Sequence, residues 1–120
     1  MSTKYQDGMQ AQQQAESHLI DKGYRILERN YRIRTGEVDI IARHGNYVVF
    51  VEVKFRRSVD FGYPRESVGI IKQQRISRTA MHYIATHKIS GMDFRFDVIE
   101  VLMQGGIAEI NHIENAFDAQ

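Results

Sequence analysis

Three acidic residues and one lysine interrupt two otherwise apolar segments within residues 36–57. Successive side chains of a β-strand point to opposite faces, so Glu37 and Asp39 share one face of the first segment. In the same way, Glu52 and Lys54 share one face of the second segment, Tyr47–Phe55. Carboxylates and a lysine at this spacing indicate a metal-dependent site for phosphodiester hydrolysis.

The connection between the two segments is His44-Gly45-Asn46, and a short connection that contains glycine predicts an antiparallel hairpin. In such a hairpin Asp39 can approach Glu52. Carboxylates that converge on one point repel each other unless a cation lies between them, and a hard divalent ion such as Mg²⁺ prefers oxygen ligands. Lys54 could orient the attacking water or neutralise charge in the transition state.

The same residues have a second interpretation, in which a Glu-x-Lys pair is a solvated strand face or a cross-strand ion pair. Glu52 and Lys54, however, alternate with valines in a segment that reads as a buried central strand. Because a buried charge is costly unless it is paired or bound to a metal, this setting favours the metal site.

The hydrophobic pattern predicts two helices and five strands, which must position these side chains. Gly23 suits a helix C-cap, and the only proline, Pro64, marks a loop. The expected elements are a helix at Gly8–Asp21, strands at Tyr24–Ile33, Glu37–Arg43 and Tyr47–Phe55, a loop at Arg56–Arg65, a helix at Ser67–His87, and strands at Asp93–Leu102 and Ile107–Ile113. The expected inward-facing helix residues are Ala11, Ala15, Leu19, Ile20, Val68, Ile71, Ile76, Ala80, Tyr83 and Ile84. This order predicts an α/β fold with a central mixed five-stranded sheet flanked by helices.

Short motifs along almost the whole chain carry a resemblance to a known family. In order, they are Gly23-Tyr24, Arg29-Asn30, Gly36-Glu37-Val38-Asp39, Phe50-Val51-Glu52-Val53-Lys54 with Arg56, Phe61-Gly62, Lys72, Arg95-Phe96-Asp97-Val98 and Asn115-Ala116-Phe117. On these residues the chain resembles the YraN-like family of bacterial proteins, related to the restriction-endonuclease-like PD-(D/E)xK superfamily and similar to archaeal Holliday-junction resolvases. The resemblance implies a single restriction-endonuclease-like domain over residues 1–120.

The resemblance also implies roles for the residues of the hairpin. Asp39 and Glu52 would bind the metal, Mg²⁺ or Mn²⁺, the main-chain carbonyl of Val53 would assist, and Lys54 would complete the catalytic motif. Glu37 would lie behind these ligands. Resolvase-like relatives act as symmetric dimers, so a homodimer is a possible assembly.

One position departs from the family pattern. The family usually carries a glutamate on the first helix, three residues before an alanine that aligns with Ala15, and this chain has Gln12 there. Glutamine offers a neutral oxygen but neither a negative charge nor a base. Glu16, four residues on and on the same helical face, is a candidate substitute. The departure keeps open a nucleic-acid-binding protein with little or no nuclease activity.

Length and composition limit the protein class. A chain of 120 residues with 42% hydrophobic residues can bury one core, which predicts one domain. The absence of cysteine excludes disulfides and thiolate zinc sites. No apolar run approaches the length of a membrane span, and the N-terminal residues lack a signal-peptide core, so we expect a cytoplasmic protein without a membrane partner.

The net charge of +1 hides an uneven distribution. Between Lys22 and Arg78 there are 13 Lys or Arg residues and 6 Asp or Glu residues. The segment Ile89–Gln120 has 1 Lys or Arg residue and 6 Asp or Glu residues. A basic middle segment fits a polyanion such as DNA, although solvated strand edges and loops explain it equally well. The candidate nucleic-acid contacts are Arg34, Arg56, Arg57, Arg65, Lys72 and Arg75.

Three functions remain in order of preference. The first is a nuclease-like protein, a Mg²⁺-dependent or Mn²⁺-dependent endonuclease acting on branched or other DNA. The second is a noncatalytic DNA-binding or RNA-binding module, and the third is an interaction protein without a metal site. The segment Arg95 to Asp97 is expected to reflect sheet packing, with Arg95 or Asp97 pairing to a neighbour. The five histidines show no ligand spacing tied to the carboxylates.

Overall fold

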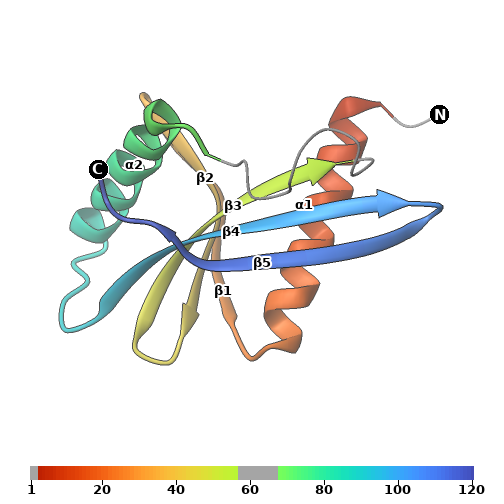
Figure 1. Cartoon of the computed structure of the whole chain (residues 1–120). Helices are drawn as coiled ribbons and strands as arrows, with labels where there is room; N and C mark the ends of the chain where they lie inside the picture. Colours follow the sequence, from red (N-terminus) through yellow and green to blue (C-terminus); the bar gives the residue numbers. More distant parts are fainter. Residues whose placement is uncertain (1–2, 57–67) are drawn as a thin grey trace.

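A computed structural model describes residues 3–56 and 68–120 of the chain. Its elements are α1 (Lys4–Asp21), β1 (Arg25–Ile33), β2 (Gly36–His44), β3 (Tyr47–Arg56), α2 (Ile70–Thr86), β4 (Asp93–Gln104) and β5 (Ile107–Phe117). The strands form one sheet in the order β1-β2-β3-β4-β5, in which β3 and β4 are parallel and the other neighbours antiparallel (Figure 1). The predicted α/β fold and element order are confirmed.

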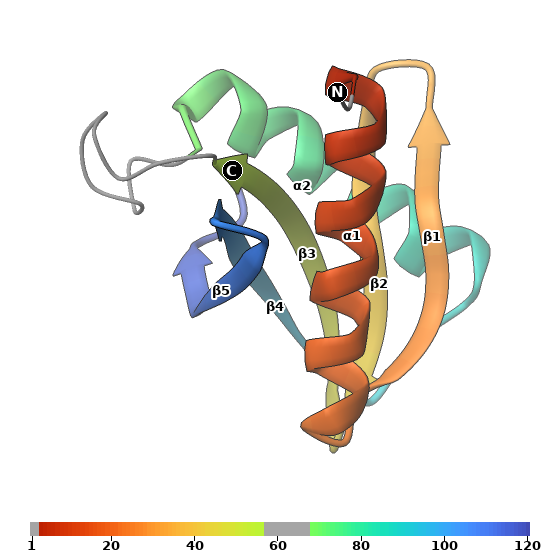
Figure 2. The same cartoon turned by 90° about the vertical axis from the view of Figure 1, so that its right-hand side faces the viewer.

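The two helices cover opposite faces of the sheet, as the two perpendicular views show (Figures 1 and 2). Ala11, Ala15 and Leu19 of α1 pack against one set of strand residues, and Ile76, Ala80 and Tyr83 of α2 pack against another. The α1 face of the sheet is lined by Ile40, Ala42, Val49, Val51, Ile99 and Val101, and the α2 face by Val38, Ile41, Val48, Phe50, Phe96 and Val98. The core therefore has two layers.

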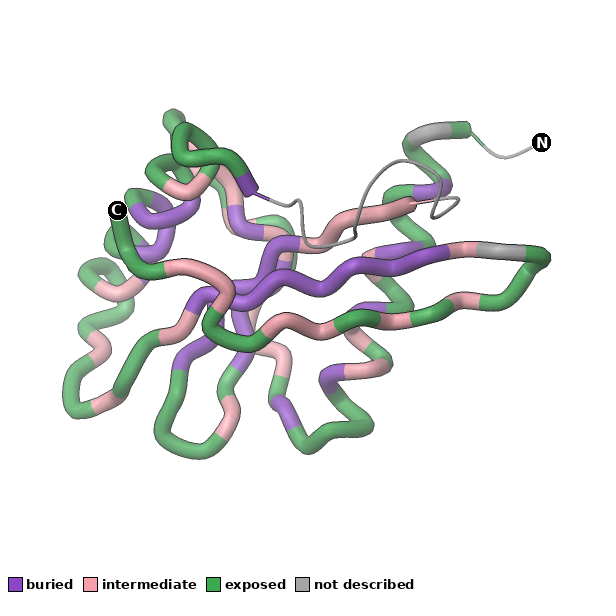
Figure 3. Tube along the Cα trace, viewed as in Figure 1, coloured by how far each residue is buried: buried purple, intermediate pink, exposed green. Residues whose placement is uncertain are grey.

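The strands β3 and β4 form the buried centre of the sheet (Figure 3). Val48 through Glu52 are all buried, as are Phe96 through Leu102. A strand covered on both faces reads as a continuous apolar run, which explains why these segments lack polar alternation except at the few acidic positions. Those acidic residues therefore lie inside the protein and need partners.

The ends of α1 follow local signals. Thr3 caps the helix because its side chain accepts a hydrogen bond from the Gln6 amide while the Gln6 side chain accepts one from the Thr3 amide. This capping box starts the helix four residues before the predicted Gly8. At the other end, Gly23 has φ +88°, and the amides of Gly23 and Tyr24 donate to the carbonyls of Ile20 and Leu19, which stops the helix as expected.

The prediction that Ile20 and Ile71 face the core is wrong. Ile20 is 55% exposed and Ile71 is 61% exposed. Each lies five residues from an inward-facing residue of its helix, Ala15 and Ile76 respectively, and five residues correspond to a rotation of about 140° from that face. The strand β5 also extends to Phe117, four residues past the predicted end. The predicted loop after Arg56 lies outside the described residues, as do the proposed contacts of Arg57 and Arg65.

Gly36 lets α2 approach the start of β2. A Cβ at Gly36 would lie 2.5 Å from Thr79 Oγ1 and 2.6 Å from the main-chain oxygen of Arg75. Only a residue without a side chain fits that gap, so the glycine fixes how closely the basic face of α2 lies beside β2.

Among the described residues, neither helix is long and apolar enough to cross a membrane.

Candidate functional site

The candidate site begins where the side-chain alternation of two neighbouring strands slips by one residue. On β1, the side chain of Arg29 forms an ion pair with Glu16 of α1, whereas the side chain of Tyr31 contacts Tyr83 of α2. These two residues are two positions apart and would normally point to the same face of the sheet. On β2, Ile40 packs on the α1 side and Val38 on the α2 side. The residue of β1 at the slip, Asn30, has φ +49°. Asparagine tolerates this left-handed conformation better than most residues, which permits the slip.

Asp39 lies at the slip on β2, where β2 and β3 stop pairing. The last pair toward this end is Ile40 with Val51. Beyond it the amide of Val53 has no partner strand carbonyl from β2, and instead it donates to Asp39 Oδ2 at 2.8 Å. Asp39 therefore acts as a side-chain substitute for a strand carbonyl, and this bond holds its carboxylate beside residue 52 of β3.

The carboxylates of Asp39 and Glu52 meet at this point, as the hairpin pattern predicts. Burial, the negative charge of Glu52 and a hydrogen bond between the two carboxyl groups raise the pKa of Asp39 to about 8, against the lowering effect of the Val53 amide. Glu52 is only 4% exposed. A buried carboxylate and a half-buried one in contact are strongly disfavoured from both being ionised unless a positive charge lies close to them. The pair therefore requires either a shared proton or a cation.

A lysine lies against the pair, but it comes from α2. Lys72 Nζ forms an ion pair with Glu52 Oε2. Lys54 follows Glu52 on the same face of β3 and is partly exposed, opposite Glu100 of β4 in the sheet register. Lys54 does not line the groove in which Asp39 and Glu52 lie. The contact between Lys72 and Glu52 links residues far apart in sequence, so no local pattern could have indicated it.

Glu37 and Gln12 belong to one chain of hydrogen bonds around Asn30. The amides of Gln12 and Asn30 bond reciprocally, at 3.0 and 3.2 Å, and Asn30 Nδ2 also donates to Glu37 Oε1 at 3.3 Å. Gln12 Nε2 lies 3.5 Å from the main-chain oxygen of Asp39. Glu37 in turn pairs with Arg32 at 3.2 Å. Gln12 therefore reaches the site, and Glu37 supports it from behind.

Glu16, the candidate substitute for the missing family glutamate, has another partner. Its Oε1 accepts a hydrogen bond from Arg29 Nε at 2.8 Å, at the surface between α1 and β1. The structure thus brings Gln12, and not Glu16, next to Asp39.

A groove of about 1170 Å³ runs between β2, the turn after β1 and α2, with Asp39, Glu52 and Val53 in its wall. Its cationic side chains are those of Arg32, Arg34, Lys72, Arg75 and Arg78. Among the described residues, Arg32 and Lys72 form ion pairs, whereas none involves Arg34, Arg75 or Arg78. The groove therefore presents positive charge beside the carboxylate pair. Arg56, another candidate contact, lies within 3.9 Å of Glu100 and does not line this groove.

The residues present fit a divalent cation only in part. Asp39 and Glu52 supply carboxylate oxygens, and the Val53 carbonyl is adjacent in the chain. Within residues 3–56 and 68–120, no group of three or more His, Cys, Asp or Glu side chains is arranged to hold a metal. A cation such as Mg²⁺ would therefore complete its coordination with water or substrate oxygens, which is usual for this ion.

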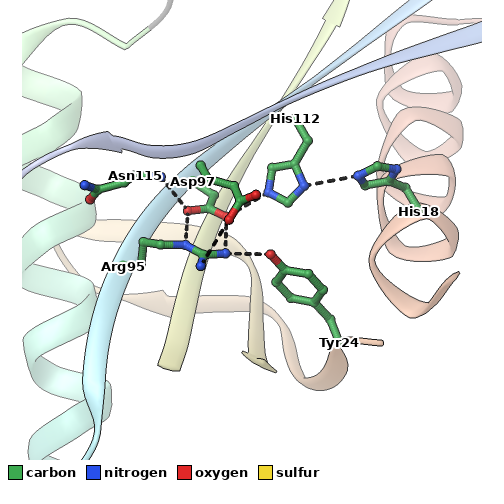
Figure 4. Close-up of polar contacts among 7 residues, drawn as sticks. His18, Tyr24, Arg95, Asp97, His112 and Asn115 are labelled. Carbon is green, nitrogen blue, oxygen red and sulfur yellow. Dashed lines mark hydrogen bonds and ion pairs between the residues drawn. The ribbon is translucent and has the colours of Figure 1, made fainter. Parts of the chain in front are cut away.

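A second polar cluster surrounds Asp97 on β4 (Figure 4). Arg95 donates to both Asp97 oxygens, at 2.8 and 2.9 Å, and to the Tyr24 hydroxyl at 2.6 Å. His112 Nε2 lies 2.7 Å from Asp97 Oδ2, and the Asn115 amide donates to Oδ1 at 3.0 Å. Burial would raise the pKa of Asp97, but the bonds from His112, Arg95 and Asn115 outweigh it, so that pKa is lowered. Arg95 and Asp97 were expected to pair with a neighbour, and they pair with each other.

Histidines extend this cluster to α1. His112 Nδ1 lies 3.1 Å from His18 Nε2, and burial together with the charge of His112 lowers the pKa of His18. These two histidines belong to no recognisable sequence motif. The Arg-x-Asp spacing on β4 was the only available signal, because the other members come from α1, the turn after α1, and β5.

The comparisons with known proteins agree with the sequence motifs. A family model described as "Uncharacterised protein family UPF0102" matches residues 11–101. A UPF0102 protein of Lachnoclostridium phytofermentans is 45% identical over 94% of this chain and 93% of its own length. A UPF0102 protein of Alkaliphilus metalliredigens is 52% identical over 83% of this chain and 87% of its own length. A UPF0102 protein of Syntrophus aciditrophicus is 44% identical over 98% of this chain and 93% of its own length. These matches confirm the resemblance to the YraN-like family.

Proposed function

The chain belongs to the uncharacterised protein family UPF0102, and we propose that it is a nuclease-like protein that binds nucleic acid, with DNA as the preferred substrate and Mg²⁺ or Mn²⁺ as cofactor. Phosphodiester hydrolysis would take place at Asp39 and Glu52, which would hold the cation with the Val53 carbonyl.

One observation carries this proposal. Glu52 is buried, Asp39 is half-buried, and the two carboxyl groups face each other in the wall of a groove that five described cationic side chains line. Lys72 pairs with Glu52, yet burial and the charge of Glu52 still raise the pKa of Asp39 in spite of the Val53 hydrogen bond. A perturbed acidic group in a cleft is a recognised indication of a functional site.

The basic residues around the carboxylate pair would have different roles in binding and hydrolysis. Arg34, Arg75 and Arg78 would hold the phosphates of the strand by charge, because they have no ion-pair partner among the described residues. Lys72 would share its charge between Glu52 and the substrate phosphate. When bound, the cation would polarise a phosphoryl oxygen and favour deprotonation of the attacking water. Lys54 would contribute only if the substrate extends past Glu52 along β3.

A second candidate function is binding without cleavage. Gln12 stands where the family usually carries a glutamate, and its amide pairs with Asn30 beside Asp39. The site then has two acidic ligands instead of three, which weakens the hold on a divalent cation. The cationic groove would still bind a nucleic-acid backbone.

The test is metal-dependent cleavage of end-labelled linear DNA and four-way junction DNA by the wild type and by Asp39→Ala and Glu52→Gln variants. Glu109→Gln is the matched control, since it removes an exposed acidic group from β5. Cleavage that needs Mg²⁺ or Mn²⁺, persists in the control and disappears in both site variants supports the nuclease. Salt-dependent binding without cleavage supports the second candidate, and the absence of both binding and cleavage contradicts both.

A further inference from the structure

A second cleft, of about 720 Å³, opens on the α1 side of the same carboxylate site. Asp39 and Val53 line both this cleft and the cationic groove, so the two openings meet at the proposed reaction centre. The walls of the second cleft come from the first half of α1, from β1 and from the end of β3. A strand that follows the cationic groove past Asp39 would reach this cleft next.

The chemical character of the second cleft differs from that of the groove. Both arginines in its wall have carboxylate partners, Arg29 with Glu16 at 2.8 Å and Arg32 with Glu37 at 3.2 Å. The two acidic residues of the wall are Glu16, which pairs with Arg29, and Asp39, where the cleft meets the groove. The rest of the described wall is neutral, with amide, aromatic and apolar side chains. It is formed by Tyr5, Met9, Gln12, Gln13, Asn30 and Phe55.

Two of these side chains are exposed at the first turns of α1. Tyr5 is 75% exposed and Met9 is 48% exposed. They lie one helical turn apart on one face of α1, because residues at a spacing of four are neighbours on a helix surface. An aromatic ring and a thioether in this position offer a flat, polarisable surface to a ring that enters the cleft.

The amides of the cleft are arranged around Asn30. Asn30 and Gln12 satisfy each other reciprocally, and the left-handed backbone of Asn30 holds its amide in this position. Gln13, exposed on α1, adds an amide with both a donor and an acceptor. Amide groups of this kind are the side chains that recognise the donor and acceptor edges of nucleobases.

We propose that the second cleft holds an unpaired nucleobase, namely the base next to the phosphate at Asp39, of a strand whose backbone lies in the cationic groove. This inference rests on the proposed function and narrows its substrate class to nucleic acids with an unpaired nucleotide at the reaction centre. The base stacks on Tyr5, and its edge meets the amides of Gln12, Gln13 and Asn30.

The division of charge explains why the base must be unpaired. A continuous duplex presents negatively charged phosphates along its whole surface, and only the cationic groove offers the positive charge to bind them. A neutral cleft with an aromatic side chain instead fits a base that has left the stack, and unstacking costs least where the strand is already single.

The experiment measures binding by fluorescence anisotropy, with a labelled DNA single strand and with the same strand annealed to its complement, in EDTA to prevent cleavage. The Tyr5→Ala variant is compared with Tyr5→Phe, which keeps the ring, and with Ile107→Ala, which removes an equally exposed hydrophobic side chain from β5. We expect Tyr5→Ala to weaken single-strand binding about tenfold and to leave duplex binding unchanged, because stacking on one aromatic ring has about this effect. Tyr5→Phe and Ile107→Ala should bind both DNAs like the wild type.

The outcomes separate this inference from the function on which it rests. Equal single-strand binding by Tyr5→Ala and the wild type, or an equal loss for both DNAs, overturns the base-binding cleft while leaving the groove intact. Arg75→Ala tests the groove, since it should weaken binding to both DNAs and reduce the salt dependence. A wild type that binds neither DNA overturns the proposed function and the cleft together.

Discussion

Two aspartates on the same sheet, Asp39 and Asp97, show opposite solutions to the burial of a carboxylate. Asp97 is completely buried and accepts hydrogen bonds from Arg95, His112 and the Asn115 amide, which lower its pKa. Asp39 accepts one bond, from the Val53 amide, and otherwise faces Glu52, so its pKa is raised.

The difference indicates which cluster is complete. At Asp97 the protein supplies its own positive charge, and Figure 4 shows that the partners close around the carboxylate from β4 and β5. At Asp39 the carboxylates face each other beside a groove, and the nearest cation, Lys72, is half exposed. The first cluster therefore stabilises the fold, whereas the second has room for a charge from outside.

The largest expected effect comes from Asp97→Asn. The substitution removes the negative charge and replaces one of the two acceptor oxygens with an NH2 group, so Arg95 loses its bidentate partner and His112 loses its charged one. Loss of one member of a buried ion pair costs about 3–5 kcal/mol of unfolding free energy. Urea denaturation measures this loss of stability, and Asp118→Asn, at an exposed position, is the control. A loss below about 1 kcal/mol would contradict the structural role of this cluster.

Gly36→Ala should have the next largest effect. The added methyl group would overlap Thr79 Oγ1 and the Arg75 carbonyl, so α2 must move away from β2. We expect a loss of about 1–3 kcal/mol, typical of overpacking. Because α2 carries Lys72 and Arg75, the same shift should weaken binding to DNA, which anisotropy would detect. Gly8→Ala is the control for stability, since a Cβ at Gly8 meets no atom within 4 Å. Normal stability of Gly36→Ala would contradict the close approach.

The pH dependence of stability distinguishes the two aspartates. Because the pKa of Asp39 is raised, the folded state binds more protons than the unfolded state between pH 3.8, the ordinary pKa, and about pH 8. The contribution of Asp39 to the free energy of unfolding therefore falls as the pH rises through this range. The lowered pKa of Asp97 acts oppositely, and its contribution is present above pH 3.8 and is lost at lower pH.

The measurement compares wild type and Asp39→Asn by urea denaturation in EDTA across this range. The lowered pKa of His18 adds a slope of the opposite sign below its ordinary pKa of 6.5, and this slope is common to both proteins. The wild type should lose stability relative to Asp39→Asn as the pH rises toward 8. Parallel curves for the two proteins would show that Asp39 titrates normally.

The smallest effect is expected for Glu16→Gln. The pair of Glu16 and Arg29 is at the surface, with the Arg29 side chain 57% exposed, and such pairs contribute about 0–1 kcal/mol. Metal-dependent changes in melting temperature should be the same as in the wild type, because Glu16 is bound to Arg29 and not to the carboxylate pair. A variant that lost the metal response would make Glu16 the substitute ligand after all.

The order of elements and the approach of Asp39 to Glu52 could be predicted because both follow from local patterns. Alternating apolar residues define the strands, and the Gly45 turn fixes the hairpin. The inward faces of the helices were predicted correctly at Ala15 and Ile76 but not at Ile20 and Ile71, where a hydrophobic residue lies off the inward face.

Contacts between distant segments could not be predicted from one sequence. The strand pattern indicated Lys54 as the lysine of the site, but it is Lys72 that pairs with Glu52, and Lys72 reaches it from α2 because Gly36 allows the helix to approach. The slip at Asn30 depends on a left-handed residue within a strand, which no pattern marks. Likewise, the Asp97 cluster contains His18 from α1, Tyr24 from the turn after it, and His112 from β5.

The central claim is that Asp39 and Glu52 form a cation site, and calorimetric titration of Mn²⁺ into the wild type and Asp39→Asn at pH 7 tests it most directly. We predict saturable binding to the wild type with release of a proton, since the pKa of Asp39 lies above this pH and the carboxylate must be ionised to bind. The variant should show no such binding. Absence of binding to the wild type, or equal binding to both proteins, would contradict the account.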